Sequence, residues 1–558
     1  MISVSGCRRL TALTVLVGLV LASASCTPIA KRIDRLAGGP TMPADTGIVP
    51  PTEDPGPSRA TPEPALPPGP LKITITEAIL LSLENNRALE TERLSPSIEQ
   101  TFEDQERALF DPAIAAEVAA GRIKGQRQAR SGSQTEDFRS DTADGIIFLE
   151  QYFPTGTAVL LEAGSDMSDS DLYEDPFYAS RLGMTVTQAL LQGFGPEVNL
   201  VRLRQARLDT HLSGLRQARL DTHLSAFELR GFSESLVAEV ERTCWDYALA
   251  RRQIEIVEES LKVARQQLDE TEQLIAVGRL ARAELAAVQA EVAAQDQALI
   301  DARSGEETTR LQLLRLLNPP GPGLWQREIE LVHPAALPEL TLEAVERYVS
   351  VSQRMRPELN EARLQIQRGD LELVKTRNGL LPLMELFITL GQSGYADSFG
   401  RSVDRIDDGS YDTLTGVRFR YPFFNRDAQA LHRRALLTRE QAQKALDNLS
   451  QLVEVDVRTA HIEVHRTRQQ IAATTVTRQF DEEKLRTETE KLRVGKSTSF
   501  LVAQAQRDLL VSRIAEVRAL ANYLKALIDL YRRDGSLLER RGISAPGREP
   551  VALSPSTS

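Results

Sequence analysis

The 558-residue chain is poor in cysteine, histidine and aromatic residues. It has three cysteines and six histidines, and aromatic residues make up 5% of the chain. The cysteines, Cys7, Cys26 and Cys244, have no paired spacing, which argues against both a disulfide framework and a zinc site. Scarce aromatic residues, in a chain rich in alanine, leucine, glutamine, glutamate and arginine, are typical of long helices rather than of compact cores.

The sequence also lacks the motifs of common catalytic and cofactor sites. It contains no glycine-rich phosphate loop, no GxSxG nucleophile elbow and no HExxH zinc motif. His461 and His465 are four residues apart and could share one face of a helix, but no third metal ligand lies nearby in the sequence. We therefore expect a protein that is not an enzyme and that needs no cofactor or metal.

Positive charge and long apolar runs are also missing. The 67 lysines and arginines against 78 aspartates and glutamates give a net charge of −11. A nucleic-acid-binding protein needs a basic face, so we expect no nucleic-acid partner. Beyond the N-terminal region, no segment offers the roughly eighteen apolar residues that a membrane-spanning helix requires. We expect any membrane-spanning part to consist of strands.

The first 25 residues have the pattern of a signal peptide. Arg8 and Arg9 precede an apolar run over residues 10–22, which small residues follow. Two processing routes fit this segment. The letters ASA at 22–24 suit ordinary signal cleavage, whereas SASC, which ends at Cys26, is similar to a bacterial lipobox with serine in place of the usual leucine. On the second route Cys26 is a lipidation candidate; on the first it has no role.

The rest of the chain divides into a linker, two repeats and a tail. Residues 26–71 contain PPTEDPGPSRATPEPALPPGP, a composition that favours an extended linker. The first repeat covers residues 72–318 and the second covers residues 341–533, with a linker at 319–340 and a tail at 534–558. Each repeat is expected to start on an initial helix, continue through strands and end in a long helical hairpin.

The strand segments alternate apolar residues with polar or small ones. We expect strands at about 112–191 in the first repeat and at about 383–424 in the second. In GVRFRYPFF, at 416–424, Val417 and Phe419 alternate with Arg418 and Arg420. A transmembrane sheet has this alternation, and so does a half-buried sheet in a soluble protein. Residues 146–163 predict a further hairpin that turns at the letters PTG, and it either joins the other strands or caps them.

The helical segments carry apolar or small residues at alternating steps of four and three, which is the heptad pattern of a coiled coil. This pattern covers residues 250–302, with Gly278 in its middle, and it returns at 453–471 before Gly495. A glycine turn between two such segments indicates an antiparallel helical hairpin. We therefore expect hairpins at about 197–318 and at about 426–533.

One short segment is duplicated. LRQARLDTHLS stands at 203–213 and again at 215–225. If one twelve-residue copy is left out, 63 positions separate Leu203 from Gly278, against 64 between Leu431 and Gly495. The duplication is therefore interpreted as a local insertion in the first long helix, absorbed near the strand-to-helix junction as a bulge, a kink or an overhang.

Four segments resemble the TolC-like outer-membrane efflux family, whose members are called outer membrane factors. LKITITEAILLSLENNRALETERL at 71–94 resembles the family's initial helix. RPELNEARLQIQRGDLELVKTRNGLLPLMELFITLG at 356–391 resembles its second copy. VTQALLQGFGPEVNLVRLRQAR at 186–207 and RFRYPFFNRDAQALHRRA at 418–435 are similar to the family's two strand-to-helix passages. The resemblance covers roughly residues 72–535.

The resemblance implies a mixed α and β fold. Long antiparallel coiled-coil hairpins would form a periplasmic tunnel, and strands would contribute to a trimeric transmembrane β-barrel in the outer membrane of a Gram-negative-type bacterium. It implies a passive exit duct for tripartite drug or metal efflux or for type I secretion. The implied partners are two further copies, outer-membrane lipid, a periplasmic adaptor (membrane fusion) protein and an inner-membrane pump of RND or ABC type. The alternative is a periplasmic coiled-coil lipoprotein that acts as a scaffold without a pore.

The resemblance also implies functional residues. The family's hairpin tips contact the adaptor, and the matching positions here are Val277, Gly278, Arg279, Leu280, Val494, Gly495, Lys496, Ser497 and Thr498. The family has leucine after the glycine, where this chain has Arg279 and Lys496. The alternative for both glycines is that they are ordinary helix ends, and the adaptor contact is favoured over it. Positions matching the family's tunnel constriction are Glu284, Leu501 and Gln504, although Glu284 also fits a solvated helix residue. Arg418 and Arg420 are candidates for the barrel lumen.

Overall fold

The computed structural model describes residues 70–128, 132, 135–171, 175–200, 214–332, 342–547 and 549–551. These residues form two units, each of which is described by itself. The signal peptide, Cys26, nearly all of the first linker and the first copy of the duplication lie outside the described residues. The second copy, from Leu215 to Ser225, lies in a long helix.

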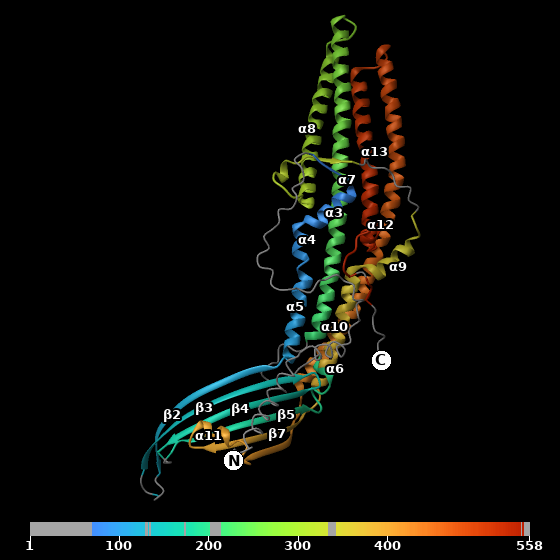
Figure 1. Ribbon diagram of the computed structural model, residues 1–558. Coiled ribbons are helices and arrows are strands. Elements are labelled where there is room, and N and C mark those ends of the chain that lie inside the picture. Colours follow the sequence, from blue (N-terminus) through green and yellow to red (C-terminus); the bar gives the residue numbers. More distant parts are fainter. Residues whose placement is uncertain are drawn as a thin grey trace, which may run out of the picture. The chain divides into compact units, whose positions relative to one another are not determined.

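The first unit is built on one antiparallel sheet of six strands (Figure 1). Its strands, in spatial order, are β2 (Ala113–Gln128), β3 (Thr135–Phe153), β4 (Thr157–Ser170), β5 (Phe177–Ala189), β7 (Leu383–Ala396) and β8 (Tyr411–Arg420). Strands β5 and β7 come from the two different repeats, yet they pair from Tyr178–Ala396 to Ala189–Glu385. Strands β2 and β8 are the edges of the sheet.

The register separates an apolar face of the sheet from a polar face. On the apolar face, Val186 pairs with Ile388 and Met384 pairs with Phe419. Further members of this face are Ile147, Leu149, Val159, Leu161, Leu182, Met184, Leu386, Leu390 and Val417. On the polar face, Thr185 pairs with Thr389, and Arg418 pairs with Glu385. The alternation predicted from the sequence therefore holds across neighbouring strands.

The hairpin predicted at 146–163 is formed by β3 and β4. Its turn lies at Pro154–Gly156, where Gly156 has φ +85°, a conformation that favours glycine. Both strands belong to the same sheet as β5, β7 and β8. Between β7 and β8 the chain forms a short helix, α11 (Phe399–Asp404), so the strand region predicted at about 383–424 is interrupted. The Oγ atoms of Ser402 and Ser180 lie 2.7 Å apart and hold α11 against the sheet.

Four long helices dominate the second unit: α7 (Gly214–Ala276), α8 (Ala283–Leu317), α12 (Arg426–Arg493) and α13 (Ser499–Arg533). The beginnings of α7 and α12 belong to the first unit. Figure 1 shows α7 beside α8 and α12 beside α13. The 63 residues of α7 span about 95 Å at 1.5 Å per residue. The heptad positions Val257, Leu261, Ala264 and Thr271 are buried, as are Val453, Val457, Ala460, Val464 and Thr467. Of the helices in the described ranges, none combines the length and the apolar character needed to cross a membrane.

Shorter elements complete the described part of the chain. They are β1 (Leu71–Ile73), α3 (Ile75–Asn85), α4 (Arg87–Glu92), α5 (Ser95–Arg107), η2 (Ala108–Phe110), α6 (Pro196–Asn199), η3 (Leu324–Gln326), β6 (Ile329–Leu331), α9 (Val345–Met355), α10 (Pro357–Gly379) and α14 (Leu537–Arg540). Helix α3 starts with a capping box, because Thr74 and Glu77 each accept a hydrogen bond from the other's backbone N–H. The segment predicted as a linker at 319–340 therefore includes η3 and β6.

The core of the second unit joins both hairpins and the C-terminal segment. Its fully buried members include Val237, Leu313, Leu314, Leu317, Leu530, Leu537 and Leu538. Cys244 also lies in this core and carries a free thiol. Burial raises the pKa of the Cys244 thiol to about 12. Helix α14, which follows α13, is thus packed into the core through two leucines.

Candidate functional site: the two hairpin tips

The first hairpin reverses direction over Val277–Leu280. Gly278 has φ +74°, and its N–H donates to Ile275 O at 3.0 Å. The next N–H, from Arg279, reaches back to Leu274 O at 2.8 Å. Closing bonds of this kind around a left-handed residue end many helices, and glycine adopts that conformation without a Cβ clash. Gly278 and these local hydrogen bonds are therefore enough to end α7, and no partner at the tip is needed to explain the turn.

The second hairpin reverses in the same way. Gly495 has φ +71°, its N–H donates to Leu492 O at 3.0 Å, and Lys496 N–H donates to Lys491 O at 2.8 Å. Helix α13 then starts behind Thr498, whose hydroxyl accepts a hydrogen bond from Leu501 N–H. The two tips thus share one backbone geometry.

Each tip exposes an aliphatic side chain followed by a basic one. Val277 is 70% exposed and Val494 is 67% exposed. Arg279 and Lys496 are also exposed, whereas Leu280 and Ser497 are half-buried. The Ser497 hydroxyl donates to Glu488 Oε2 at 2.6 Å. Each tip therefore presents an apolar side chain and a positive charge on a fixed turn.

The tips lie together because Glu284 joins the two hairpins. Glu284 is in the first turn of α8, and its Oε2 accepts a hydrogen bond from Ser499 N–H, at the start of α13, at 2.9 Å. The carboxylate thereby satisfies a backbone donor at a helix N-terminus, where the helix dipole also favours negative charge. Glu284 is thus engaged by the second hairpin, and its assignment to a tunnel constriction stays a prediction.

A second contact joins the hairpins two turns further along α8. Glu291 is only 1% exposed, and its Oε2 lies 2.7 Å from Nη1 of Arg507 on α13. Its Oε1 accepts a hydrogen bond from Gln295 at 2.7 Å. Sequence reasoning missed Glu291 and Arg507. The spacing of Glu291, seven residues after Glu284 and four before Gln295, was a signal that both carboxylates lie on the same helix face.

Further ion pairs link the helices at positions further from the tips. Lys484 Nζ on α12 lies 2.6 Å from Asp508 Oδ2 on α13. Arg513 lies 3.3 Å from both Glu259 on α7 and Glu482 on α12, so it contacts both hairpins. Leu501 and Gln504 are exposed on α13, near its start. Their assignment to a tunnel constriction stays a prediction.

The polar face of the sheet carries the predicted arginines and an ion-pair group that was not predicted. Arg418 lies 3.3 Å from Glu385 and over the ring of Phe387. Arg420 is an exposed residue at the end of β8. The missed group is Arg181, which contacts both carboxylate oxygens of Asp412, at 2.7 and 2.9 Å, and also contacts Glu162. Arg181 stands two residues before Gly183, at a position that the strand alternation already assigns to this face.

Metal ligands do not cluster in the described ranges, where no group of three histidine, cysteine or carboxylate residues comes together. His461 and His465 lie with their rings 4.8 Å apart, and His461 Nε2 lies 3.2 Å from Glu343 O. The ring of His461 also packs against that of Tyr348.

Outer-membrane channels are among the solved structures with a similar fold. The chain is similar to the CmeC channel of Campylobacter jejuni, with 13% identity and a TM-score of 0.60, over 83% of this chain and 86% of that one. The MtrE channel of Neisseria gonorrhoeae in its open state matches with 17% identity and a TM-score of 0.55, over 83% and 89%. VceC of Vibrio cholerae matches with 15% identity and a TM-score of 0.55, over 83% and 96%. The predicted TolC-like fold is confirmed.

Comparison with curated protein sequences finds no match. The chain does match the outer membrane efflux protein family over residues 204–319 and 349–536, which is more than half of its length. The match includes both hairpins with their tips. Since members of this family are outer-membrane channels, the expected outer-membrane location and the expectation of a non-enzyme are confirmed. The chain belongs to the outer membrane efflux protein family.

Proposed function

We propose that this chain is the passive outer-membrane exit duct of a tripartite export system and that its hairpin tips dock the periplasmic adaptor. The observation that carries the proposal is the paired tips. Two matching glycine turns, held side by side by Glu284, expose Val277 and Val494 together with Arg279 and Lys496. Apolar side chains that are exposed together on neighbouring turns offer a surface for a protein contact.

Assembly as a homotrimer is supported by apolar surface left uncovered in the single chain. Helix α12 exposes Leu452, Val455, Ile462, Val476 and Phe480. The steps between successive members are three, seven, fourteen and four, which match a heptad repeat, so these residues form a second stripe, separate from the buried seam. Among the described strands, β2 and β8 are the two edges of the sheet, and each leaves one side unpaired. Neighbouring copies would cover the stripe and pair the edges.

Within the duct, we infer that the polar face of the sheet lines the passage, with Arg418, Arg420 and Arg181 exposed to water. Near the tips, we propose that the exposed residues Leu501 and Gln504 form a constriction, while Glu284 links the two hairpins through its hydrogen bond to Ser499. Lipidation of Cys26 stays a prediction, and mass spectrometry of the mature N-terminus decides it.

Planar-bilayer conductance tests the proposal directly. The full chain is extracted from outer membranes in mild detergent, and its oligomeric state is measured before it is added to the bilayer. Trimers that open discrete ion channels are the expected result. A monomer that is released without detergent and opens no channel would overturn the duct and favour the scaffold.

If the protein is a trimer but opens no channels, a variant shows whether the duct is merely closed. Replacing Glu284 and Glu291 with alanine removes both hydrogen-bonded contacts between the hairpins near the tips. A closed duct then gains conductance, whereas a trimer that stays silent in this variant contradicts the proposal.

A further inference from the structure

The basic residue nearest to the tip is paired on each of the four long helices. On α7, α8, α12 and α13, in that order, the pairs are Arg265 with Asp296, Arg303 with Glu258, Arg493 with Glu490 and Arg507 with Glu291, at 2.9, 2.9, 3.3 and 2.7 Å. Each of these cations therefore has its counter-charge within the chain, and the helices end without an excess charge from them.

The two turns carry positive charge that no described residue neutralises. They read VGRLAR at 277–282 and VGKST at 494–498, so together they hold Arg279, Arg282 and Lys496 and no carboxylate. All three side chains are exposed, and within the described ranges none of them forms an ion pair. In a chain with a net charge of −11, the turns are therefore a local excess of positive charge.

Carboxylates close to the turns in sequence already have other partners. Glu284 accepts a hydrogen bond from Ser499 N–H at 2.9 Å. Glu488 accepts one from the Ser497 hydroxyl at 2.6 Å, and it lies 2.7 Å from Lys491 Nζ. The positive charge of the turns is therefore open to a binding partner.

The contact between the hairpins also brings the charges of both turns near each other. Arg282 stands two residues before Glu284, and Lys496 stands three residues before Ser499. Because one residue spans at most about 3.6 Å, both charges lie close to the hydrogen bond that joins Glu284 to Ser499. A partner that contacts this area meets the charges of both turns.

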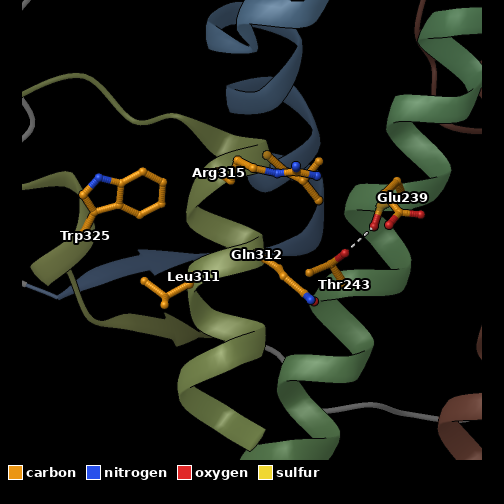
Figure 2. A pocket seen from close by; sticks show the side chains of 7 residues that line it. Glu239, Thr243, Leu311, Gln312, Arg315 and Trp325 are labelled. Carbon is orange, nitrogen blue, oxygen red and sulfur yellow. Dashed lines mark hydrogen bonds between the residues drawn. The ribbon is translucent and has the colours of Figure 1, made fainter. Parts of the chain in front are cut away.

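The charge balance is different near the end of α8. A cavity of about 420 Å³ lies there between α7, α8 and η3, and Figure 2 shows Arg315 of α8 between Trp325 and Glu239 of α7. A basic and an acidic side chain thus line the same cavity. Charge of a single sign is therefore a feature of the turns and not of the whole hairpin.

A protein that covers the exposed valines also contacts these cations. Arg279 stands two residues after Val277, and Lys496 stands two residues after Val494. A cation that is removed from water without a partner costs free energy, whereas a carboxylate on the partner compensates for that cost. Complementary charge across an interface mainly sets specificity and the association rate. The surface therefore suits a protein with carboxylates beside an apolar patch.

We propose that Arg279, Arg282 and Lys496 select the adaptor by charge. The matching adaptor carries aspartate or glutamate side chains around the apolar patch that receives the two valines. This inference rests on the proposed docking of the adaptor at the tips, and it adds the property by which one adaptor is accepted and another is rejected. An adaptor with basic side chains at this place is repelled, because like charges then face each other across the contact.

Charge reversal in the full chain tests the proposal. Arg279→Glu, Arg282→Glu and Lys496→Glu are introduced together in the bacterium that produces the protein, and export of a fluorescent dye from cells is measured. We expect export to fall about tenfold or more, with unchanged trimer yield and bilayer conductance, because the acidic side chains of the adaptor then meet like charge. The conservative variant, Arg279→Lys with Arg282→Lys and Lys496→Arg, keeps the charge and should preserve export.

The matched control reverses three charges away from the turns. Lys262, Arg468 and Arg518 are exposed on α7, α12 and α13, and they likewise form no ion pair within the described ranges. Changing all three to glutamate alters the net charge by the same amount and should leave export at the level of the parent.

The outcomes separate this inference from the docking on which it rests. If the reversed variant exports like the parent while Val277→Asp with Val494→Asp does not, the tips dock the adaptor and selection by charge is wrong. If both variants export like the parent, the tips do not dock the adaptor and both proposals fail. Loss of export in the conservative variant would also contradict the proposal, because charge would then not be the property that is selected.

A photo-crosslinker at the first turn identifies the chemistry of the partner. p-Benzoylphenylalanine replaces Ala281, an exposed residue, and is activated by light in intact cells, after which the crosslinked peptide is sequenced by mass spectrometry. We expect a peptide of a periplasmic protein that contains aspartate or glutamate. Changing these residues to lysine should restore export to the reversed variant. A peptide without carboxylates, or a lipid adduct, would overturn the proposal.

Discussion

The two hairpin tips share one backbone turn but differ in how their side chains brace it. Gly278 and Gly495 have φ angles of +74° and +71°, and the N–H that follows each closes a 2.8 Å hydrogen bond onto the end of its helix. At the second tip, Ser497 is fixed by Glu488 and Thr498 caps α13. Both tips therefore have the same backbone turn, but the side-chain hydrogen bonds of Ser497 and Thr498 are found at the second tip.

The first hairpin lacks this local support and contributes to the second one instead. Arg282, at the start of α8, makes no side-chain cap, and Glu284, two residues later, accepts a hydrogen bond from Ser499. The two repeats have thus specialised, because one supplies a carboxylate that the other uses. The start of α8 is consequently bonded to the start of α13, and the two tips are not equivalent.

The largest effect is expected from the exposed valines. Changing Val277 and Val494 together to aspartate places a charge at the apolar point of each tip. If these residues anchor the adaptor, export of a fluorescent dye from cells should fall about tenfold or more, since anchor residues dominate interface energy. Trimer yield and bilayer conductance should not change.

The matched control keeps the tips apolar. Val277→Ile with Val494→Ile should preserve export. If the aspartate pair exports as well as the parent, the tips do not dock the adaptor. Each valine changed alone then shows whether the two tips contribute equally.

A smaller effect is expected at the buried contact between the hairpins. Glu291→Ala removes the acceptor of Arg507 and Gln295, and charged hydrogen bonds of this kind contribute about 1.5–3 kcal/mol. Glu284→Ala removes a helix cap near the surface and should cost about 1 kcal/mol. Denaturant unfolding followed by circular dichroism measures both. Equal losses of unfolding free energy in the two variants would contradict the expectation that the buried carboxylate of Glu291 contributes more than the carboxylate of Glu284.

The turn glycines should respond alike. An added Cβ meets no atom within 4 Å at Gly278 or at Gly495, so Gly→Ala at either position adds backbone strain alone. That strain costs about 1–2 kcal/mol. The control is Gly305→Ala, within α8, where alanine should stabilise the helix by about 0.5–1 kcal/mol. Unfolding midpoints that move in the same direction in all three variants would contradict this account.

A pH dependence is expected from two buried carboxylates away from the tips, Glu234 on α7 and Glu361 on α10. Burial raises the pKa of Glu234 to about 8, and the negative charges of Glu539 and Glu358 add to the shift, although Arg230 lies 3.1 Å away and opposes it. Burial likewise raises the pKa of Glu361 to about 7, with Glu228 and Glu358 adding to the shift.

The sign of this effect follows from the raised pKa. The folded protein holds a proton on Glu234 that the unfolded chain releases near pH 4.5, so this group's stabilisation is complete below that pH and is lost as the pH rises toward 8. Unfolding of the full chain at pH 5 to 8 should show falling stability, and Glu234→Gln should flatten the slope. The surface variant Glu270→Gln serves as the control. A slope that Glu234→Gln leaves unchanged would contradict the assignment.

Local patterns predicted much of the fold. The alternation of Val417 and Phe419 with Arg418 and Arg420 predicted the two faces of β8, because successive side chains of a strand point to opposite sides. The heptad seams and the glycines at 278 and 495 predicted the hairpins for an equally local reason. The role of the tips in docking stays a prediction, because a turn has the same sequence signal whether or not a partner contacts it.

Contacts between distant segments were not predicted. Glu284 and Ser499 are 215 positions apart, and Glu291 and Arg507 are 216 apart. No periodicity within one helix encodes which residue faces it from another. The pairing of β1 with β6, inside a region that reads as a linker, was missed because three-residue strands carry no readable alternation.

Composition and short-range pattern were enough to establish helical hairpins with glycine turns, two-faced strands and a family resemblance, since each depends on residues a few positions apart. The tertiary structure alone decided that Glu284 caps a helix of the other repeat, that Glu291 is buried against Arg507, and that β5 and β7 join the repeats in one sheet. Those outcomes depend on which surfaces meet when the chain packs, and burial then fixes the partner and the protonation of each polar group.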